Sequence, residues 1–200
     1  MNQNNAILVI TAFFLALSAC QETSYTPKPK GYFKIDLPEK KYRLFNPSDC
    51  PFQFEVPHYS KVVRDTTFFN EATAYPCWMN IDFKSQGGKI HLSYRPVDNR
   101  DTLRKLIDDS HKLTFKHSIK ADYIDEMQIH NKRNNVSGIL YQVGGNAASN
   151  IQFYVSDDSA HFIRGALYFP VEPNEDSLAP VIDFIKADIL HMLESMKWKE

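Results

Sequence analysis

The sequence predicts an α+β protein built mainly as an antiparallel sheet with helices packed on its faces, in a sandwich. Segments that alternate apolar and polar residues, as half-buried strands do, follow one another between residues 78 and 169. Two further segments, beginning near residues 101 and 177, place their apolar residues at helical spacing. An antiparallel sheet buries its apolar face against such helices, so the two patterns together define the fold class.

The chain opens with a short apolar run, residues 6–20, that ends in Leu-Ser-Ala-Cys. About twelve apolar residues are too few to cross a bilayer but suit a signal peptide, and small residues precede the cysteine where a peptidase must fit. We predict a lipoprotein signal peptide over 1–19 and acyl chains such as palmitate on Cys20. An ordinary secretory signal is the alternative, and a buried core helix is less favoured because the run contains so little polarity.

Residues 20–31 are predicted to be a lipid-anchored tether, because they contain prolines and lysines and almost nothing to bury. Two or three acyl chains on Cys20 would make the membrane anchor effectively permanent. Gln21 follows the cysteine where an Asp would favour the inner membrane, and Glu22 is the sole acid nearby. These residues favour the outer membrane with the domain facing the periplasm.

The remaining chain, 32–200, has the length of a single globular α+β domain. A hydrophobic content of 43% and a net charge of -1 are those of an ordinary folded protein and give no general attraction to nucleic acid. Cys50 and Cys77 would meet an oxidising compartment, so we expect a disulfide between them, with two buried free thiols as the alternative. A redox role is disfavoured because the chain has no Cys-x-x-Cys pair.

Folded structure is expected to begin near 32–35. The strands predicted from alternation are 52–56, 78–84, 89–95, 123–129, 136–143, 150–156 and 161–169. The segments 78–84 and 89–95 should form a hairpin with one buried and one polar face. Turn residues connect the last three strands, which should therefore form an antiparallel meander.

The first helix is predicted to be capped by Asp101 and to extend as far as His117. Its buried face should carry Leu103, Leu106, Ile107 and Leu113.

The second helix is predicted to be capped by Ser177, with Pro180 early enough to be tolerated. Its apolar stripe comprises Leu178, Val181, Ile182, Ile185, Ile189, Met192, Leu193 and Met196.

Recognised catalytic and metal-binding patterns are missing from the sequence. His111 and His117 lie six residues apart with no His-Glu-x-x-His motif, and neither Gly-x-Ser-x-Gly nor Ser-x-x-Lys occurs. We therefore predict no metal site, no cofactor and no catalytic residue. The paired acids at 108–109 and 157–158 are interpreted as solvated.

The most unusual local stretch is the loop 144–150, where Gly144, Gly145 and Asn146 would let a backbone approach a ligand or another chain closely. Its N–H groups could cradle an anion, although a sharp hairpin connection needs the same glycines. His91 on the polar face of the first hairpin and Arg164 are further candidate binding residues. A solvated sheet face or polar contacts beneath a helix would equally explain the hairpin residues.

Seven segments follow one another along the chain: PKPKGYF (27–33), CPF (50–52), PCWMNID (76–82), KIHLSY (89–94), KHSIKA (116–121), GGNAAS (144–149) and FIRGALYF (162–169). Taken together and in this order, they resemble the gliding motility lipoprotein GldD family. The resemblance implies a membrane lipoprotein of the gliding machinery, which is linked to the type IX secretion system that exports adhesins and enzymes. It implies no catalytic residues.

The leading hypothesis is a non-enzymatic outer-membrane lipoprotein that supports gliding and secretion through contacts with other envelope proteins. The alternative is a periplasmic enzyme or small-ligand-binding lipoprotein that uses the loop 144–150 with His91, His117 or Arg164. A peptidoglycan-contacting module is a third hypothesis, which the tether length permits but no specific residue supports.

Overall fold

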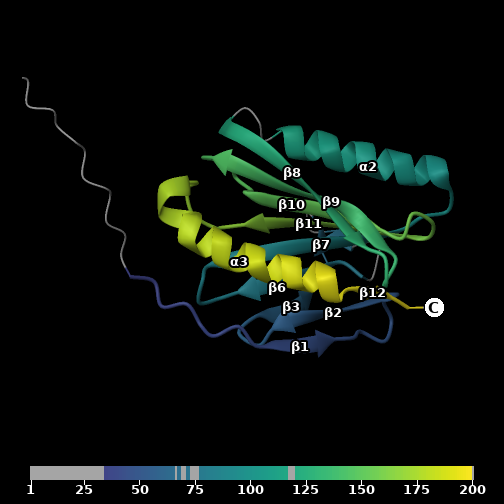
Figure 1. Ribbon diagram of the computed structural model, residues 1–200, viewed down its shortest axis with the longest axis horizontal. Helices are drawn as coiled ribbons and strands as arrows, with labels where there is room; N and C mark the ends of the chain where they lie inside the picture. The colour runs from purple at the N-terminus through teal and green to yellow at the C-terminus, as the bar shows by residue number, and fades with distance from the viewer. Residues whose placement is uncertain (1–33, 66, 69–70, 73–76, 117–119, 200) are drawn as a thin grey trace, which may run out of the picture. The chain divides into compact units, whose positions relative to one another are not determined.

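A seven-stranded antiparallel sheet organises the domain in the computed structural model, which describes residues 34–65, 67–68, 71–72, 77–116 and 120–199 (Figure 1). In spatial order its strands are β3 (Lys61–Arg64), β6 (Met79–Phe83), β7 (Gly88–Pro96), β11 (His161–Tyr168), β10 (Ile151–Ser156), β9 (Val136–Gly145) and β8 (Ala121–Asn131). The signal peptide 1–19, Cys20 and the tether 20–31 lie outside the described residues, and the domain boundary at 32 stays a prediction.

One face of this sheet carries the main hydrophobic core. Helix α3 (Glu175–Ser195) and a three-stranded sheet of β1 (Tyr42–Phe45), β2 (Phe52–Pro57) and β12 (Lys197–Trp198) pack there. Fully buried side chains from all three layers meet in this core, for example Phe54 of β2, Ile81 of β6 and Ile185 of α3. Two very short strands, β4 (Thr67–Phe68) and β5 (Glu71–Ala72), pair only with each other.

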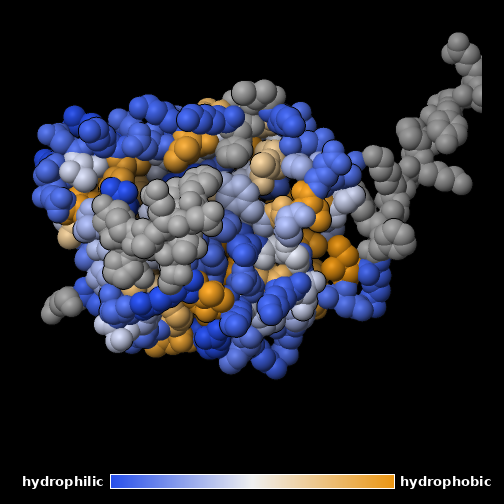
Figure 2. All heavy atoms as spheres, turned by 180° about the vertical axis from the view of Figure 1, so that it is seen from behind, coloured by the Kyte–Doolittle hydropathy of each residue, from blue (hydrophilic) through white to orange (hydrophobic). Residues whose placement is uncertain are grey.

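Helix α2 (Arg100–Phe115) covers part of the opposite face and creates a second, smaller core. Leu103 of the helix packs there with Tyr141, Tyr154 and Phe162 of the sheet. Figure 2, seen from behind, shows hydrophilic side chains along the helix at the top left. The sheet is thus covered by helices on both faces, and the predicted α+β sandwich is confirmed.

The strands predicted from alternation are present as the hairpin β6–β7 and the meander β9–β10–β11. Five other strands, β1, β3, β4, β5 and β12, were not predicted. They are short, and β1 and β3 bury almost none of their side chains, so alternation could not identify them. Residues 34–41 belong to no helix or strand, and the expectation that folded structure begins near 32–35 stays a prediction.

Helix α2 begins two residues earlier than predicted, because Asn99 rather than Asp101 is its N-cap. The side chain of Asn99 accepts a hydrogen bond from the backbone N–H of Thr102 at 2.9 Å. The prediction that Leu113 is buried was also wrong, since it is 41% exposed. Ser110 and Thr114 occupy the centre of the buried face instead, and each hydroxyl satisfies itself by donating to the carbonyl four residues earlier.

Helix α3 is capped by Asn174 rather than by Ser177, since the Asn174 side chain accepts a hydrogen bond from the Ser177 N–H at 3.2 Å. Pro180 lies inside the helix, in its second turn. The predicted apolar stripe is confirmed: all its members are buried except Leu178, which is partly buried against the same core. This stripe is what holds the small sheet and the large sheet together.

The disulfide expected between Cys50 and Cys77 is present, with both cysteines 2% exposed. It links the residue positions just before β2 and β6, which belong to different sheets. Closing a loop of this length stabilises a fold by roughly 3–4 kcal/mol in the chain-entropy model. Among the described residues, no helix is both long enough and apolar enough to cross a membrane.

Candidate functional site

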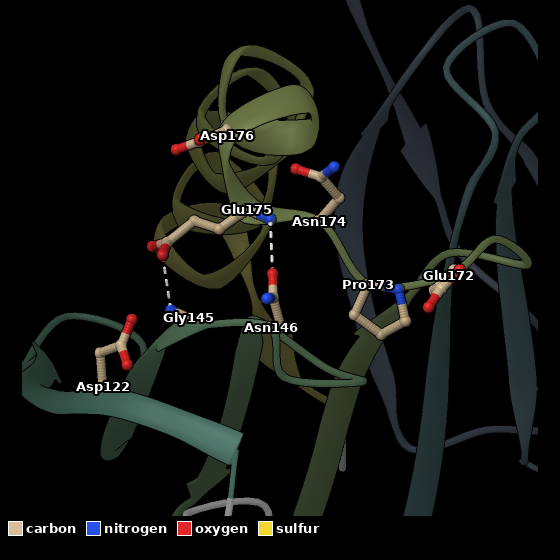
Figure 3. A pocket seen from close by; sticks show the side chains of 8 residues that line it. All are labelled: Asp122, Gly145, Asn146, Glu172, Pro173, Asn174, Glu175 and Asp176. Atoms are coloured by element: carbon tan, nitrogen blue, oxygen red, sulfur yellow. Dashed lines mark hydrogen bonds between the residues drawn. The ribbon is translucent and has the colours of Figure 1, made fainter.

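A polar pocket of about 600 Å³ lies where the loop after β9 meets the start of helix α3 (Figure 3). It is the place to which the structure brings Gly145 and Asn146 of the predicted binding loop. Its lining consists of Asp122, Gly145, Asn146, Glu172, Pro173, Asn174, Glu175 and Asp176. The loop 144–150, the first residues of β8 and the approach to α3 therefore form one site.

Hydrogen bonds within the pocket fasten the loop to the helix. The N–H of Gly145 donates to Glu175 Oε2 at 2.6 Å, and the N–H of Glu175 donates to Asn146 Oδ1 at 3.2 Å (Figure 3). Both Glu175 and Asp176 lie in the first turn of α3, where carboxylates are stabilised by the positive end of the helix dipole. The pocket's polar groups thus act first as a joint between two elements.

Local structure explains why each of the two loop positions, 144 and 145, is a glycine. Gly145 has φ of +82°, a left-handed conformation that glycine adopts without strain. A Cβ on Gly144 would lie 2.0 Å from the ring of Tyr123, so this ring packs directly on the backbone. Asn150, 6% exposed, completes the connection by donating to the Val143 carbonyl at 3.1 Å. The hairpin interpretation therefore accounts for this unusual stretch.

The electrostatics of the pocket favour a positively charged group over an anion. Four carboxylates line it, no Lys or Arg does, and the Gly145 N–H that could have cradled an anion is bonded to Glu175. Burial, with the nearby Glu175 carboxylate, raises the pKa of Tyr123. An ammonium or guanidinium group would be attracted here, whereas a phosphate or carboxylate would be repelled.

His91 lies on β7, three strands away from β9, whose end borders this pocket. Its side chain is on the face of the sheet opposite the main core. It lines a separate, more apolar hollow of about 430 Å³, and its ring and that of Tyr168 are roughly perpendicular, with centroids 5.5 Å apart. His91 is an exposed residue, although neighbouring atoms remove part of the water from its ring. That desolvation, and then repulsion from Lys89, lowers the pKa of His91.

Arg164 does not line the pocket that contains Asn146. On β11 it stands opposite Ser93 of β7, and its Nη2 donates to Gln152 Oε1 of β10 at 2.6 Å. Burial lowers the pKa of Arg164. The structure thus places the loop residues Gly144, Gly145 and Asn146 at the end of β9, beside the start of α3. His91 and Arg164 lie away from the pocket, on the adjacent strands β7 and β11.

Sequence reasoning missed a buried polar cluster centred on Asp188, which is 2% exposed on the core side of α3. Its Oδ1 accepts from Lys40 Nζ at 2.6 Å and from the Tyr42 hydroxyl at 2.9 Å, and its Oδ2 accepts from the Tyr59 hydroxyl at 2.6 Å. Lys40 also donates to the Phe184 carbonyl at 2.8 Å. This cluster fastens the start of the domain to helix α3.

The cluster extends to the surface through Tyr42. The Tyr42 ring stacks on His191 with centroids 3.6 Å apart, and His191 Nε2 lies 2.7 Å from Glu55 Oε2. The sequence did contain a sign that Asp188 is buried. It is an acid on the same helix face as the apolar residues Ile185, Ile189 and Met192. Its partners could not be found from the sequence, since they lie 129 to 148 residues away.

The tyrosines of the Asp188 cluster should make the stability of the protein sensitive to alkaline pH. Burial first, and then the hydrogen bond to Asp188, raise the pKa of Tyr42 and of Tyr59. Tyrosines in the unfolded chain ionise at a pKa of about 10, whereas these two stay protonated in the folded protein to higher pH. Their contribution to the free energy of unfolding is therefore complete below about pH 10 and is lost as pH rises above it. The free energy of unfolding should therefore fall steeply above about pH 10, and less steeply in Tyr59→Phe. Urea unfolding at a series of pH values measures both slopes, and equal slopes would contradict the assignment.

The described residues show no cluster of three or more His, Cys, Asp or Glu side chains arranged to hold a metal ion. The pocket carboxylates spread along the rim, and two of its polar groups are engaged with one another. The chemistry that the arrangement supports is binding of a cationic group or of another polypeptide.

The domain that carries these features is a helix-covered antiparallel sheet with a buried disulfide, a bond that persists in an oxidising compartment. A family profile described as "Gliding motility lipoprotein GldD" matches residues 22–198. The chain therefore belongs to the gliding motility lipoprotein GldD family, as the ordered sequence segments indicated. A lipoprotein of this family is membrane-anchored in the cell envelope.

Two other comparisons add little. The search of curated proteins finds no match. Among solved structures, the chain is similar to the solution structure of cyanobacterial PsbP (CyanoP) from Synechocystis sp. PCC 6803, with a TM-score of 0.47 and 10% identity over 81% of this chain and 95% of that chain. That similarity is too distant to assign a fold or a function.

Proposed function

We propose that this protein is a non-enzymatic outer-membrane lipoprotein that supports gliding motility and the associated type IX secretion apparatus through contacts with other envelope proteins. The observation that carries the proposal is the family match over residues 22–198, nearly the whole mature chain. The lipid on Cys20 would hold the domain at the membrane, and the tether would let it reach its partners in the periplasm.

The internal bonding of the pocket supports a structural role for these residues rather than a catalytic one. Gly145, Asn146 and Glu175 use their polar groups on one another, so they hold the loop and helix α3 in place. An enzyme site needs a nucleophile or base within hydrogen-bond reach of a substrate, and such groups would have to converge. His91 and Arg164 instead lie on other parts of the sheet.

Removing the lipid attachment site tests the anchor. In a chain whose residues 1–19 are replaced by an ordinary secretory signal, Cys20→Ala should be exported but no longer sediment with membranes, and gliding and secretion should be lost. Membrane fractionation, colony spreading and the quantity of secreted adhesin measure these effects. The same fusion with a complete lipoprotein signal and Cys20 is the control. A fully functional soluble Cys20→Ala protein would refute the anchor-dependent proposal.

The rival function, a periplasmic enzyme or small-ligand receptor at the loop 144–150, makes a different prediction. Under our proposal, Asn146→Ala and His91→Ala tested separately should each keep gliding and secretion within about twofold of the wild type, since neither residue meets a substrate. Colony spreading and secretion assays, with immunoblots to show normal protein amounts, measure this. Loss of either activity in a stable variant would favour the rival.

A further inference from the structure

Strand β8 is the outermost strand of the large sheet, and its free edge lacks a partner within the described part of the chain (Figure 1). It has 11 residues, most of them exposed, and pairs only with β9. The opposite edge strand, β3, has 4 residues and carries Lys61 and Arg64. Short, basic strands resist the addition of another strand, whereas a long exposed strand offers a row of unpaired backbone groups.

The part of β8 beyond its irregular start suits strand addition. A register shift occurs between Ala121 and Ile124, but pairing with β9 is continuous from Ile124 to Asn131. Tyr123 and Met127 are 43% and 42% exposed, so apolar surface accompanies the open backbone. On the side facing α2, a groove of about 430 Å³ runs beside β8 and is lined partly by Ile107, Ile139 and Tyr154 of the neighbouring elements.

Charge restricts what could pair there. β8 contains Asp122, Asp125 and Glu126 and no Lys or Arg. Like charges directly opposite one another destabilise a strand pair, and opposite charges stabilise it. Two copies of β8 paired antiparallel over their full length would place Glu126 against Glu126, which disfavours self-association. A strand with Lys or Arg opposite Asp125 and Glu126 would be attracted.

We propose that the free edge of β8 binds an extended, basic segment of an envelope partner by adding it to the sheet as a further strand. Main-chain hydrogen bonds along Ile124–Asn131 provide the binding, and the carboxylates of Asp125 and Glu126 select basic side chains. This inference rests on the proposed function, because it names the surface through which the contacts would be made.

The test adds to the mature protein a synthetic heptapeptide with blocked ends, in which Val and Thr residues flank two adjacent Lys residues. Adjacent Lys residues are needed because Asp125 and Glu126 are neighbours in the strand and point to opposite faces of the sheet. Amide hydrogen exchange across residues 124–131 should slow by about tenfold at saturation, while exchange in β3 stays unchanged. The double variant Asp125→Lys, Glu126→Lys should weaken peptide binding by at least about tenfold and should instead bind the same peptide with Glu in place of both Lys residues.

A matched control reverses the same charges elsewhere. Asp108→Lys, Asp109→Lys changes two adjacent exposed acids of α2 and should leave peptide binding within about twofold of the wild type. If the β8 variant fails to fold, the neutral pair Asp125→Asn, Glu126→Gln replaces it and should still weaken binding. Protection of another strand, equal binding by wild type and variant, or a dimer that depends on β8 would overturn the proposal.

Crosslinking in cells separates this inference from the proposed function. A photoreactive residue at Gln128 should capture an envelope protein, and the capture should be lost in the β8 charge variant but not in the α2 variant. The inference would be overturned if a photoreactive residue at Val171, or crosslinking of the whole protein, captured a partner that the β8 charge variant still binds. The proposed function would then still hold. Absence of any captured envelope protein from the lipidated chain would refute both.

Discussion

Replacing Asp188 with alanine should lower the free energy of unfolding by about 3–5 kcal/mol, because it removes the acceptor of a buried charge pair. The Asp188 carboxylate is 1% exposed and lies 2.6 Å from Lys40 Nζ, whose side chain is 32% exposed. Without it, the Tyr42 and Tyr59 hydroxyls and the ammonium lose their common acceptor in a partly buried space. The cost comes from leaving these donors unsatisfied, more than from the lost attraction itself.

Urea unfolding followed by the fluorescence of Trp78 and Trp198 measures this loss. Asp183→Ala, an exposed acid on the same helix, is the matched control and should change stability by less than about 0.5 kcal/mol. Asp188→Asn should fall between the two, because the amide keeps an oxygen acceptor but not the charge. An Asp188→Ala protein as stable as the control would mean that the cluster contributes nothing to the fold.

The Asp188 cluster also has a consequence for an anchored protein. Lys40 and Tyr42 are among the first described residues of the domain, and both bind helix α3 through Asp188. Any pull transmitted along the chain from a lipid on Cys20 would reach this cluster before it reached the seven-stranded sheet. In the proposed function, the cluster therefore keeps the domain folded while it is held at the membrane.

The sheet could be predicted from the sequence because its central strands bury one face. Met79, Ile81 and Phe83 alternate with polar residues, so β6 was recognisable without knowledge of its neighbours. β1 and β12 were not recognisable, because their place in the fold depends on pairing with β2. The same limit applies to the helix caps: Asn99 and Asn174 compete with nearby Asp101 and Ser177, and only the backbone geometry decides between them.

The candidate site was predictable only where its residues are neighbours in sequence. Gly145 and Asn146 do line a pocket, yet the acid that binds the Gly145 N–H is Glu175, 30 residues away. This contact reverses the charge preference expected from a glycine-rich loop, since the anion is already supplied by the protein. His91 and Arg164 lie on adjacent strands, but strand order, which separates them from the pocket, depends on long-range pairing that no local pattern encodes.

Gly138→Ala should be at least as damaging as the loss of Asp188, with a cost above about 4 kcal/mol. A Cβ on Gly138 would lie 1.9 Å from the Tyr154 carbonyl oxygen and 2.9 Å from the Val155 Cα, so backbone would meet backbone and no side-chain rotation could relieve the contact. Gly138 stands between Val155 of β10 and Ile129 of β8. Forcing β9 and β10 apart there would also displace the edge strand that we propose as the docking surface.

Gly87→Ala separates this effect from the general cost of changing a glycine. Gly87 has φ of +68° but no atom within 4 Å of an added Cβ, so its substitution should cost only the backbone strain of about 1–2 kcal/mol. Urea unfolding of both variants compares them, and amide exchange in β8 shows whether the edge strand opens in Gly138→Ala. If Gly138→Ala and Gly87→Ala lower the free energy of unfolding equally, the close approach of β9 to β10 does not limit stability. The rigidity of the β8 edge must then come from its pairing with β9 alone.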